Sequence, residues 1–229
     1  MTGELAEQAA ILVGMLTLLA LMSYLLSRVL SGIIRTERLF YLLLAPGTIV
    51  HELCHLLASL VCFVPVYEAH LFRVRRCEDG TVQLGEVVHA DVGPIRNGII
   101  GMAPLFGISA LIYLSARWLL PEGGGAVSIL TCGWTYLFLL LSFLLALGLA
   151  PSVQDLKSLP AFVVTSVVLG TAGYFLGKEL SSRYNISSLT QNAVRTVRSV
   201  NSGLVLVALA IGATCLIAFL AGRLLRATR

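Results

Sequence analysis

Apolar residues recur along the chain in long uninterrupted runs, each longer than a strand or a typical amphipathic helix. A bilayer crossing needs roughly 20 consecutive apolar residues in a helix. Six stretches approach this length, at about 9–30, 46–64, 95–120, 126–150, 161–177 and 203–222. The pattern predicts an all-α polytopic membrane protein with about six transmembrane helices, organised as a single membrane domain over residues 1–229.

The second apolar run contains a proline and a glycine close to its start. Pro46 and Gly47 interrupt the run that begins at Leu39, and proline suits the first turn of a helix. We therefore expect this span to begin at Pro46. At about 1.5 Å per residue, His51 and His55 would lie roughly 7 to 14 Å along the helix, nearer one membrane face than the midplane.

The region from 66 to 91 has a different period. Apolar and polar residues alternate from Ala69 to Arg75 and again from Thr81 to His89, and the sequence Cys-Glu-Asp-Gly between them, beginning at Cys77, suits a turn. This pattern predicts a small β-hairpin inserted after the second span. Because an isolated hairpin is marginal in water and cannot face lipid with open edges, it should pack on the helices or line a polar cavity.

Composition agrees with a multi-pass integral membrane protein. Of the 229 residues, 57% are hydrophobic and 12% are charged, and the mean hydropathy is +0.90. The net charge of +4 comes from Lys and Arg divided among short loops, where such residues ordinarily flank membrane spans. The lipid bilayer is therefore an expected partner, and nucleic acid is not.

Residues 51 to 55 read His-Glu-Leu-Cys-His, an H-E-x-x-H motif. On a helix, His51 and His55 project from one face and can hold one Zn²⁺ ion, while Glu52 is placed to accept a proton from an attacking water. Two histidines and a glutamate are costly to place in a membrane span, and ionisable residues there usually mark function. We assign His51 and His55 as metal ligands and Glu52 as the catalytic base.

A catalytic zinc site usually has a third protein ligand. Asp155 is our choice, because it lies in a polar break between two apolar runs, where irregular backbone is tolerated if it lines a cavity. The other candidates are Asp91, some of the glutamates, and the two hairpin histidines, His70 and His89.

From Pro46 to Asp155 the chain resembles the site-2 protease family of intramembrane zinc metalloproteases. In that family, an H-E-x-x-H helix is followed by a short β-structured insertion, a membrane helix, and a helix that carries an aspartate ligand. Gly93 to Asn97 is also similar to the family's G-P-x-x-N segment, although Ala103 to Gly107 is an alternative counterpart.

The resemblance implies a catalytic core at about 39–160, with accessory helices at 9–30, 161–177 and 203–222. It implies one zinc ion per chain and hydrolysis of peptide bonds in or near transmembrane segments of membrane-protein substrates. A transmembrane helix must unwind locally before its carbonyls can be attacked. The hairpin could hold the unwound segment by strand addition.

Two alternatives stay open at this point. A CAAX-processing membrane metalloprotease also uses H-E-x-x-H, with a glutamate ligand for which Glu179 is the nearest candidate. A non-catalytic metal-binding membrane protein or transporter is the other.

Overall fold

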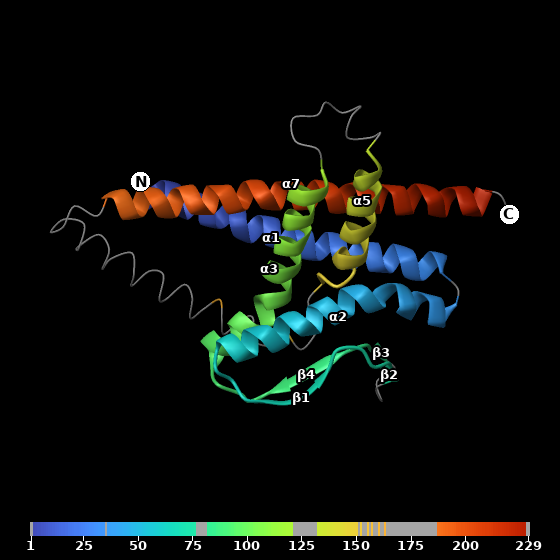
Figure 1. Cartoon of the computed structure of the whole chain (residues 1–229), viewed down its shortest axis with the longest axis horizontal. Helices are drawn as coiled ribbons and strands as arrows, with labels where there is room; N and C mark the ends of the chain where they lie inside the picture. Colours follow the sequence, from blue (N-terminus) through green and yellow to red (C-terminus); the bar gives the residue numbers. More distant parts are fainter. Residues whose placement is uncertain are drawn as a thin grey trace.

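The computed structural model describes residues 2–34, 36–76, 82–120, 132–150 and 187–227, together with residues 152, 155, 157, 160 and 163. The helices and strands of the described chain are shown in Figure 1. The helices are α1 (Thr2–Ile33), α2 (Glu37–Val61), α3 (Pro94–Leu119), α5 (Gly133–Ala146) and α7 (Ser187–Ala227), and the strands are β1 (Val66–His70), β2 (Arg75–Arg76), β3 (Val82–Gln83) and β4 (Glu86–His89).

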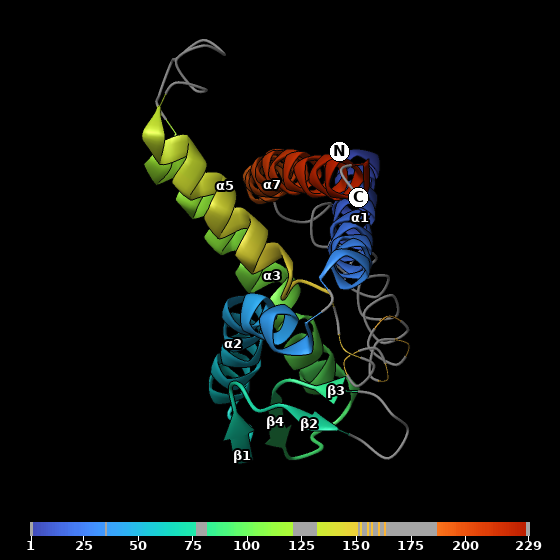
Figure 2. The ribbon, with the colours of Figure 1, turned by 90° about the vertical axis from the view of Figure 1, so that its right-hand side faces the viewer.

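The helices pack in two crossing sets. Helix α1 lies along α7, while α3 and α5 lie side by side and cross that pair steeply (Figures 1 and 2). Leu19 of α1, Ile108 of α3 and Ile211 of α7 are fully buried in the shared core, with Phe138 of α5 beside them. Helix α2 packs against α3 and α5, on the side of the molecule that carries the strands.

Four helical segments are long and apolar enough to cross a membrane. They are Ala10–Ile33, Glu37–Val61, Pro94–Leu119 and Arg195–Ala213. Many of their large apolar side chains face outward, and Leu42, Val61, Trp118 and Leu209 are each more than 65% exposed. Such extensive apolar surface suits contact with lipid. The described chain therefore has the helical, multi-pass character expected from the sequence.

The expectation of six spans is met only in part. Helix α5 covers 14 residues of the predicted span 126–150, which is short of the roughly 20 residues that a crossing helix needs. The predicted span 161–177 lies, apart from residue 163, outside the described residues.

The start predicted for the second span is wrong. Helix α2 begins at Glu37, and Pro46 lies inside it. A proline within an apolar helix removes one hydrogen bond but need not end the helix when neighbouring segments support it. At about 1.5 Å per residue, His51 lies roughly 21 Å from the start of α2 and roughly 15 Å from its end. His51 therefore lies near the middle of α2, whereas His55 lies roughly 9 Å from its end.

Helix α2 ends in a turn that sends the chain back beneath it. The Val64 N–H donates to the Ser59 carbonyl at 2.8 Å, and the Phe63 N–H donates to the Leu60 carbonyl at 3.1 Å. Phe63 has a φ of 55°, so this is a Schellman ending with phenylalanine in the left-handed position usually taken by glycine. The buried Val64 then leads into β1.

The predicted hairpin is present. Strand β1 pairs antiparallel with β4, and β2 pairs antiparallel with β3. The Arg73 N–H donates to the Leu84 carbonyl at 2.7 Å and joins the two short ladders. The predicted turn at 77–81 lies outside the described residues. The hairpin packs beneath α2 (Figure 1) and, as expected, is supported by the helices.

A pair of glycines sets how closely α2 approaches the end of α5. A Cβ added at Gly47 would lie 2.6 Å from both the Gly148 nitrogen and the Leu144 oxygen, and a Cβ at Gly148 would overlap the Gly47 carbonyl. These are backbone atoms, which cannot rotate away. Two glycines are therefore needed where the two segments cross.

We predict that Gly47→Ala destabilises the protein although alanine is normally the better helix former. The clash with backbone should cost about 1–3 kcal/mol and lower the midpoint of thermal unfolding in detergent. Gly14→Ala in α1 is the matched control, because a Cβ there meets nothing within 4 Å. Equal midpoints for the two variants would contradict the prediction.

Candidate metal centre

His51 and His55 project from one face of α2, and each ring is held by a main-chain carbonyl. Nδ1 of His51 lies 2.6 Å from the Gly148 oxygen, and Nδ1 of His55 lies 2.8 Å from the Ile100 oxygen. A carbonyl oxygen can only accept, so both Nδ1 atoms are donors. In a neutral ring this leaves the Nε2 lone pair for a metal, and metal-binding histidines are commonly oriented in this way.

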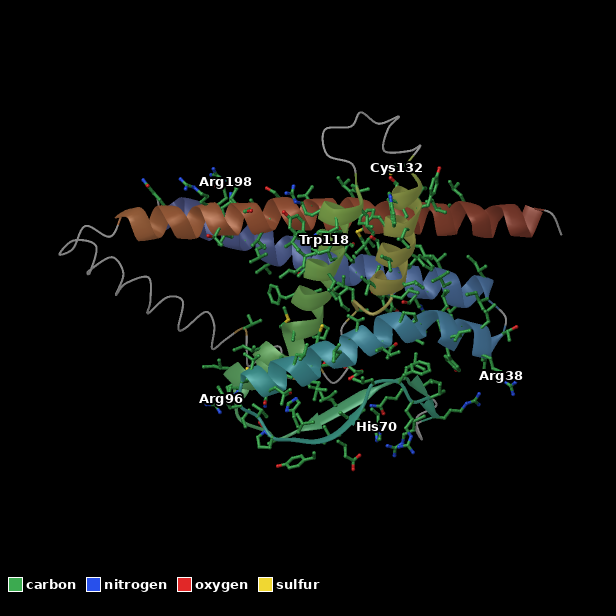
Figure 3. The ribbon with its side chains drawn as sticks, viewed as in Figure 1. Arg38, His70, Arg96, Trp118, Cys132 and Arg198 are labelled. Atoms are coloured by element: carbon green, nitrogen blue, oxygen red, sulfur yellow. The ribbon has the colours of Figure 1, made fainter. Side chains whose placement is uncertain are left out.

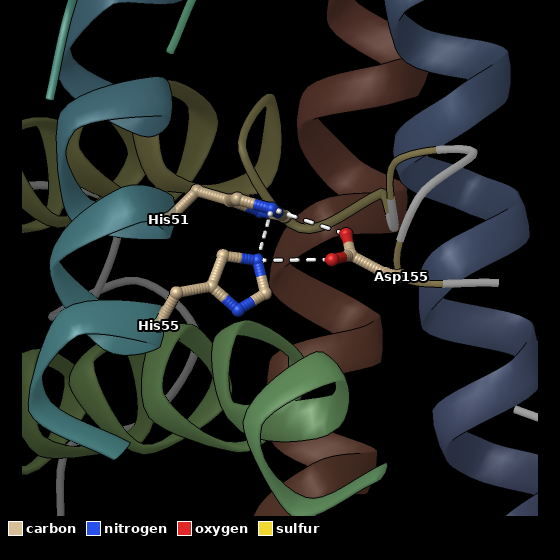
Figure 4. Close-up of side chains that lie close together, drawn as sticks. All are labelled: His51, His55 and Asp155. Carbon is tan, nitrogen blue, oxygen red and sulfur yellow. Dashed lines mark hydrogen bonds and ion pairs between the residues drawn. The ribbon is translucent and has the colours of Figure 1, made fainter. Parts of the chain in front are cut away.

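Asp155 comes to the same place from the segment that follows α5. The Ser152 N–H donates to Oδ2 of Asp155 at 2.6 Å, and the Asp155 N–H donates to Oγ of Ser152 at 3.2 Å. These reciprocal bonds form a capping box at the start of a helical turn, with aspartate in the position more often taken by glutamate. The cap fixes the Asp155 carboxylate in a direction that faces α2 (Figure 4).

The three side chains converge closely. Nε2 of His51 lies 3.4 Å from Oδ2 of Asp155, and Nε2 of His55 lies 3.1 Å from Oδ1. The two Nε2 atoms are 3.1 Å apart. The side chains of both histidines and of Asp155 are at most 10% exposed. Of the residues that the structure describes, these three form the group that could hold a metal ion.

The geometry and chemistry of the cluster fit a small divalent cation. With both Nδ1–H groups donated to carbonyls, two nitrogen lone pairs and a carboxylate face one another in a buried space. Such a set of acceptors repels itself unless a cation lies among them. Bonds of about 2.0–2.1 Å in a tetrahedral zinc site place ligand atoms roughly 3.3 Å apart, close to the separations found here. Protonation of the histidine rings is the alternative way to supply the positive charge that balances the cluster.

Glu52 is buried beside this cluster, and the hairpin covers it. Glu52 is 8% exposed, which is low for a glutamate. A Cβ added at Gly85 would lie 2.5 Å from Cγ and 2.9 Å from Oε1 of Glu52. The chain between β3 and β4 therefore passes directly over the Glu52 side chain, and glycine is the residue that allows this approach.

The remaining sequence candidates lie elsewhere. His70 is on the hairpin (Figure 3), 3.7 Å from Glu68, and His89 lies 3.0 Å from the Ala90 carbonyl. The Asn97 amide donates to Asp91 at 2.6 Å, where α3 begins. This bond and one from the Gly93 N–H lower the pKa of Asp91 below its ordinary value. None of these polar side chains belongs to the group that could hold a metal ion.

Sequence reasoning missed several parts of this site. The carbonyls of Gly148 and Ile100 belong to the backbone and carry no residue-specific signal. Ser152 could have been found, because Ser-x-x-Asp from Ser152 to Asp155 is a recognisable capping pattern. Gly85 lies within an otherwise alternating strand pattern, where glycine often marks a close approach of another group.

Comparison of the chain with models of known protein families, with curated proteins and with solved structures finds no match.

We predict that the purified protein binds about one divalent metal ion per chain and that Asp155→Ala lowers this content at least tenfold. The reason is the loss of the only carboxylate in the described cluster. Elemental analysis of detergent-purified protein measures it. His70→Ala is the matched histidine control and should keep the metal. Absence of metal from wild type under metal-replete conditions would show that protons balance the cluster.

Proposed function

We propose that this protein is an intramembrane zinc metalloprotease of the site-2 protease type, which hydrolyses peptide bonds in or near transmembrane segments of other membrane proteins. One observation carries the proposal. The Nε2 atoms of His51 and His55 lie 3.1 Å from each other and 3.1–3.4 Å from the Asp155 carboxylate oxygens, beside the buried Glu52. This group sits among helices that are apolar enough to cross a membrane.

Zinc is the metal that the donor set favours. Two imidazole nitrogens and one carboxylate form a common three-ligand set of catalytic zinc sites, which leave a fourth position open. Calcium and magnesium prefer a larger set of oxygen ligands. Other first-row ions bind similar ligands, and availability then decides among them.

In the proposed mechanism, His51, His55 and Asp155 hold the metal ion. When bound, zinc supplies Lewis acidity that activates water and polarises a carbonyl. The Glu52 carboxylate accepts the proton of the attacking water and returns it to the nitrogen of the departing amine. The Nδ1 bonds of both histidines keep the rings from turning during this cycle.

The hairpin is the part of the chain suited to hold a substrate in extended form. Within the described residues, β4 pairs with β1 on one edge, and its other edge has no strand partner there and could take an added strand. Strand β4 begins at Glu86, one residue after the glycine that contacts Glu52. A substrate strand added there would pass close to the proposed base.

We predict that Glu52→Gln keeps the metal and loses cleavage. A missing general base typically costs a factor of about 10²–10⁴ in rate, while none of the three ligands is altered. The measurement is cleavage of a synthetic transmembrane substrate in detergent, together with metal content. Glu7→Gln, on the exposed start of α1, is the matched control and should keep full activity. Cleavage by Glu52→Gln at the wild-type rate would refute the proposed role.

The two alternative functions make different predictions in the same assay. If the protein is a CAAX-processing enzyme, the Asp155→Ala variant would remain active and the Glu179→Gln variant would lose activity. Glu179 lies outside the described residues. A metal transporter would carry metal into vesicles even as Glu52→Gln. No feature of the described structure favours either alternative over the protease.

A further inference from the structure

A pocket of about 540 Å³ lies where the end of α1, the first half of α2 and strand β3 meet. Its walls include Ile34, Tyr41, Leu44, Val82 and Leu84. The volume falls within the range of roughly 300–1,000 Å³ that is usual for ligand pockets. We call it the hairpin pocket.

The hairpin pocket and the metal centre lie along the same face of α2. Leu44 lines the pocket, and His51 is one of the three residues of the candidate metal centre. Seven residues separate them, which is almost two full helical turns, so their side chains project in nearly the same direction about 10 Å apart along the axis.

The chain that covers the pocket also covers the proposed base. Leu84 forms part of the pocket wall, and the next residue, Gly85, is the one whose added Cβ would strike Glu52. An extended peptide bound beneath this segment of the hairpin would therefore span the distance from the pocket to the Glu52 carboxylate with only a few residues.

The lining of the pocket is mainly apolar but includes polar groups from Ser31, Glu37 and Tyr41. Glu37 is paired with Arg76 at 2.6 Å, which ties the far end of the hairpin to the start of α2. An unwound transmembrane segment offers both apolar side chains and unpaired backbone N–H groups. A lipid acyl chain is apolar but carries no N–H groups to pair with these polar side chains.

We propose that the hairpin pocket binds apolar side chains of the substrate on one side of the scissile bond, and that its size determines which side chains are accepted. This inference rests on the proposed protease function. Leu44 and Tyr41 are then specificity-determining residues. Both contribute to the pocket wall, and neither belongs to the metal-binding group.

The test uses zinc-loaded full-length protein and synthetic transmembrane substrates that carry Ala, Leu or Phe at successive positions beside the cleavage site. Leu44→Trp fills the pocket and should lower kcat/KM about tenfold for the Phe substrate at one position, with little effect on the Ala substrate. Tyr41→Ala enlarges the pocket and should shift the preference toward Phe. Leu42→Trp, on the outward face of α2 at 68% exposure, should leave the preference unchanged.

The outcomes separate the pocket from the protease function. If wild type cleaves and both pocket variants change all substrates equally, or none, the pocket proposal is wrong. If the variants change only the lipid or detergent that co-purifies, it is also wrong. If zinc-loaded wild type cleaves nothing, the protease function fails, and binding of the same labelled peptides to wild type and Leu44→Trp decides. Peptide affinity that ignores side-chain size in both proteins would overturn the pocket.

Discussion

The cluster of His51, His55 and Asp155 depends on two hydrogen bonds between the histidine rings and the main chain. His51 donates to the carbonyl of Gly148, just beyond α5, and His55 donates to that of Ile100 in α3. Each bond turns an Nε2 atom toward Asp155, and together they tie α2 to α3 and to the turn that follows α5. The glycine crossing of Gly47 and Gly148 brings the first of these carbonyls within reach. The second carbonyl belongs to α3, which begins at Pro94 after the N-cap Gly93 with its φ of 97°.

Two buried serines in the apolar core also donate to main-chain carbonyls. Ser59 donates to the His55 carbonyl at 2.9 Å, and Ser23 of α1 donates at 2.5 Å to the carbonyl of Ala146, the last residue of α5. Helix ends leave carbonyls without partners, which is costly away from water. The end of α5 thus acts as a junction, with Ser23 and His51 each contacting one of its carbonyls. Because these carbonyls are hydrogen-bonded, α5 can end beside the cluster without leaving unpaired backbone groups exposed to lipid.

The sequence predicted the parts of this site that depend on local periodicity. The spacing of His51 and His55 placed both rings on one helix face, and alternation with a turn signal predicted the hairpin. The start of α2 could not be obtained in this way, because tertiary support outweighs the preference of Pro46 for a first turn. The polar surroundings of Asp155 favour it among several candidates, but its convergence with the histidines depends on packing between segments far apart in the chain. Gly85 in a strand pattern indicates a close approach, but not which side chain approaches, because that depends on the packing of the hairpin against α2.

The long sequence separation within the cluster has a consequence for how the protein is made. His51 precedes the residue whose carbonyl it binds, Gly148, by 97 positions. At synthesis rates of about 5–20 residues per second, roughly 5 to 20 s pass before the ribosome adds that partner, and Asp155 follows it. During this interval His51 has neither its carbonyl partner nor Asp155, whereas the carbonyl that binds His55 belongs to Ile100, only 45 positions after it. Closure of the cluster is therefore a late step of biogenesis, and a nascent chain truncated before Asp155 would carry the H-E-x-x-H helix without its carboxylate partner.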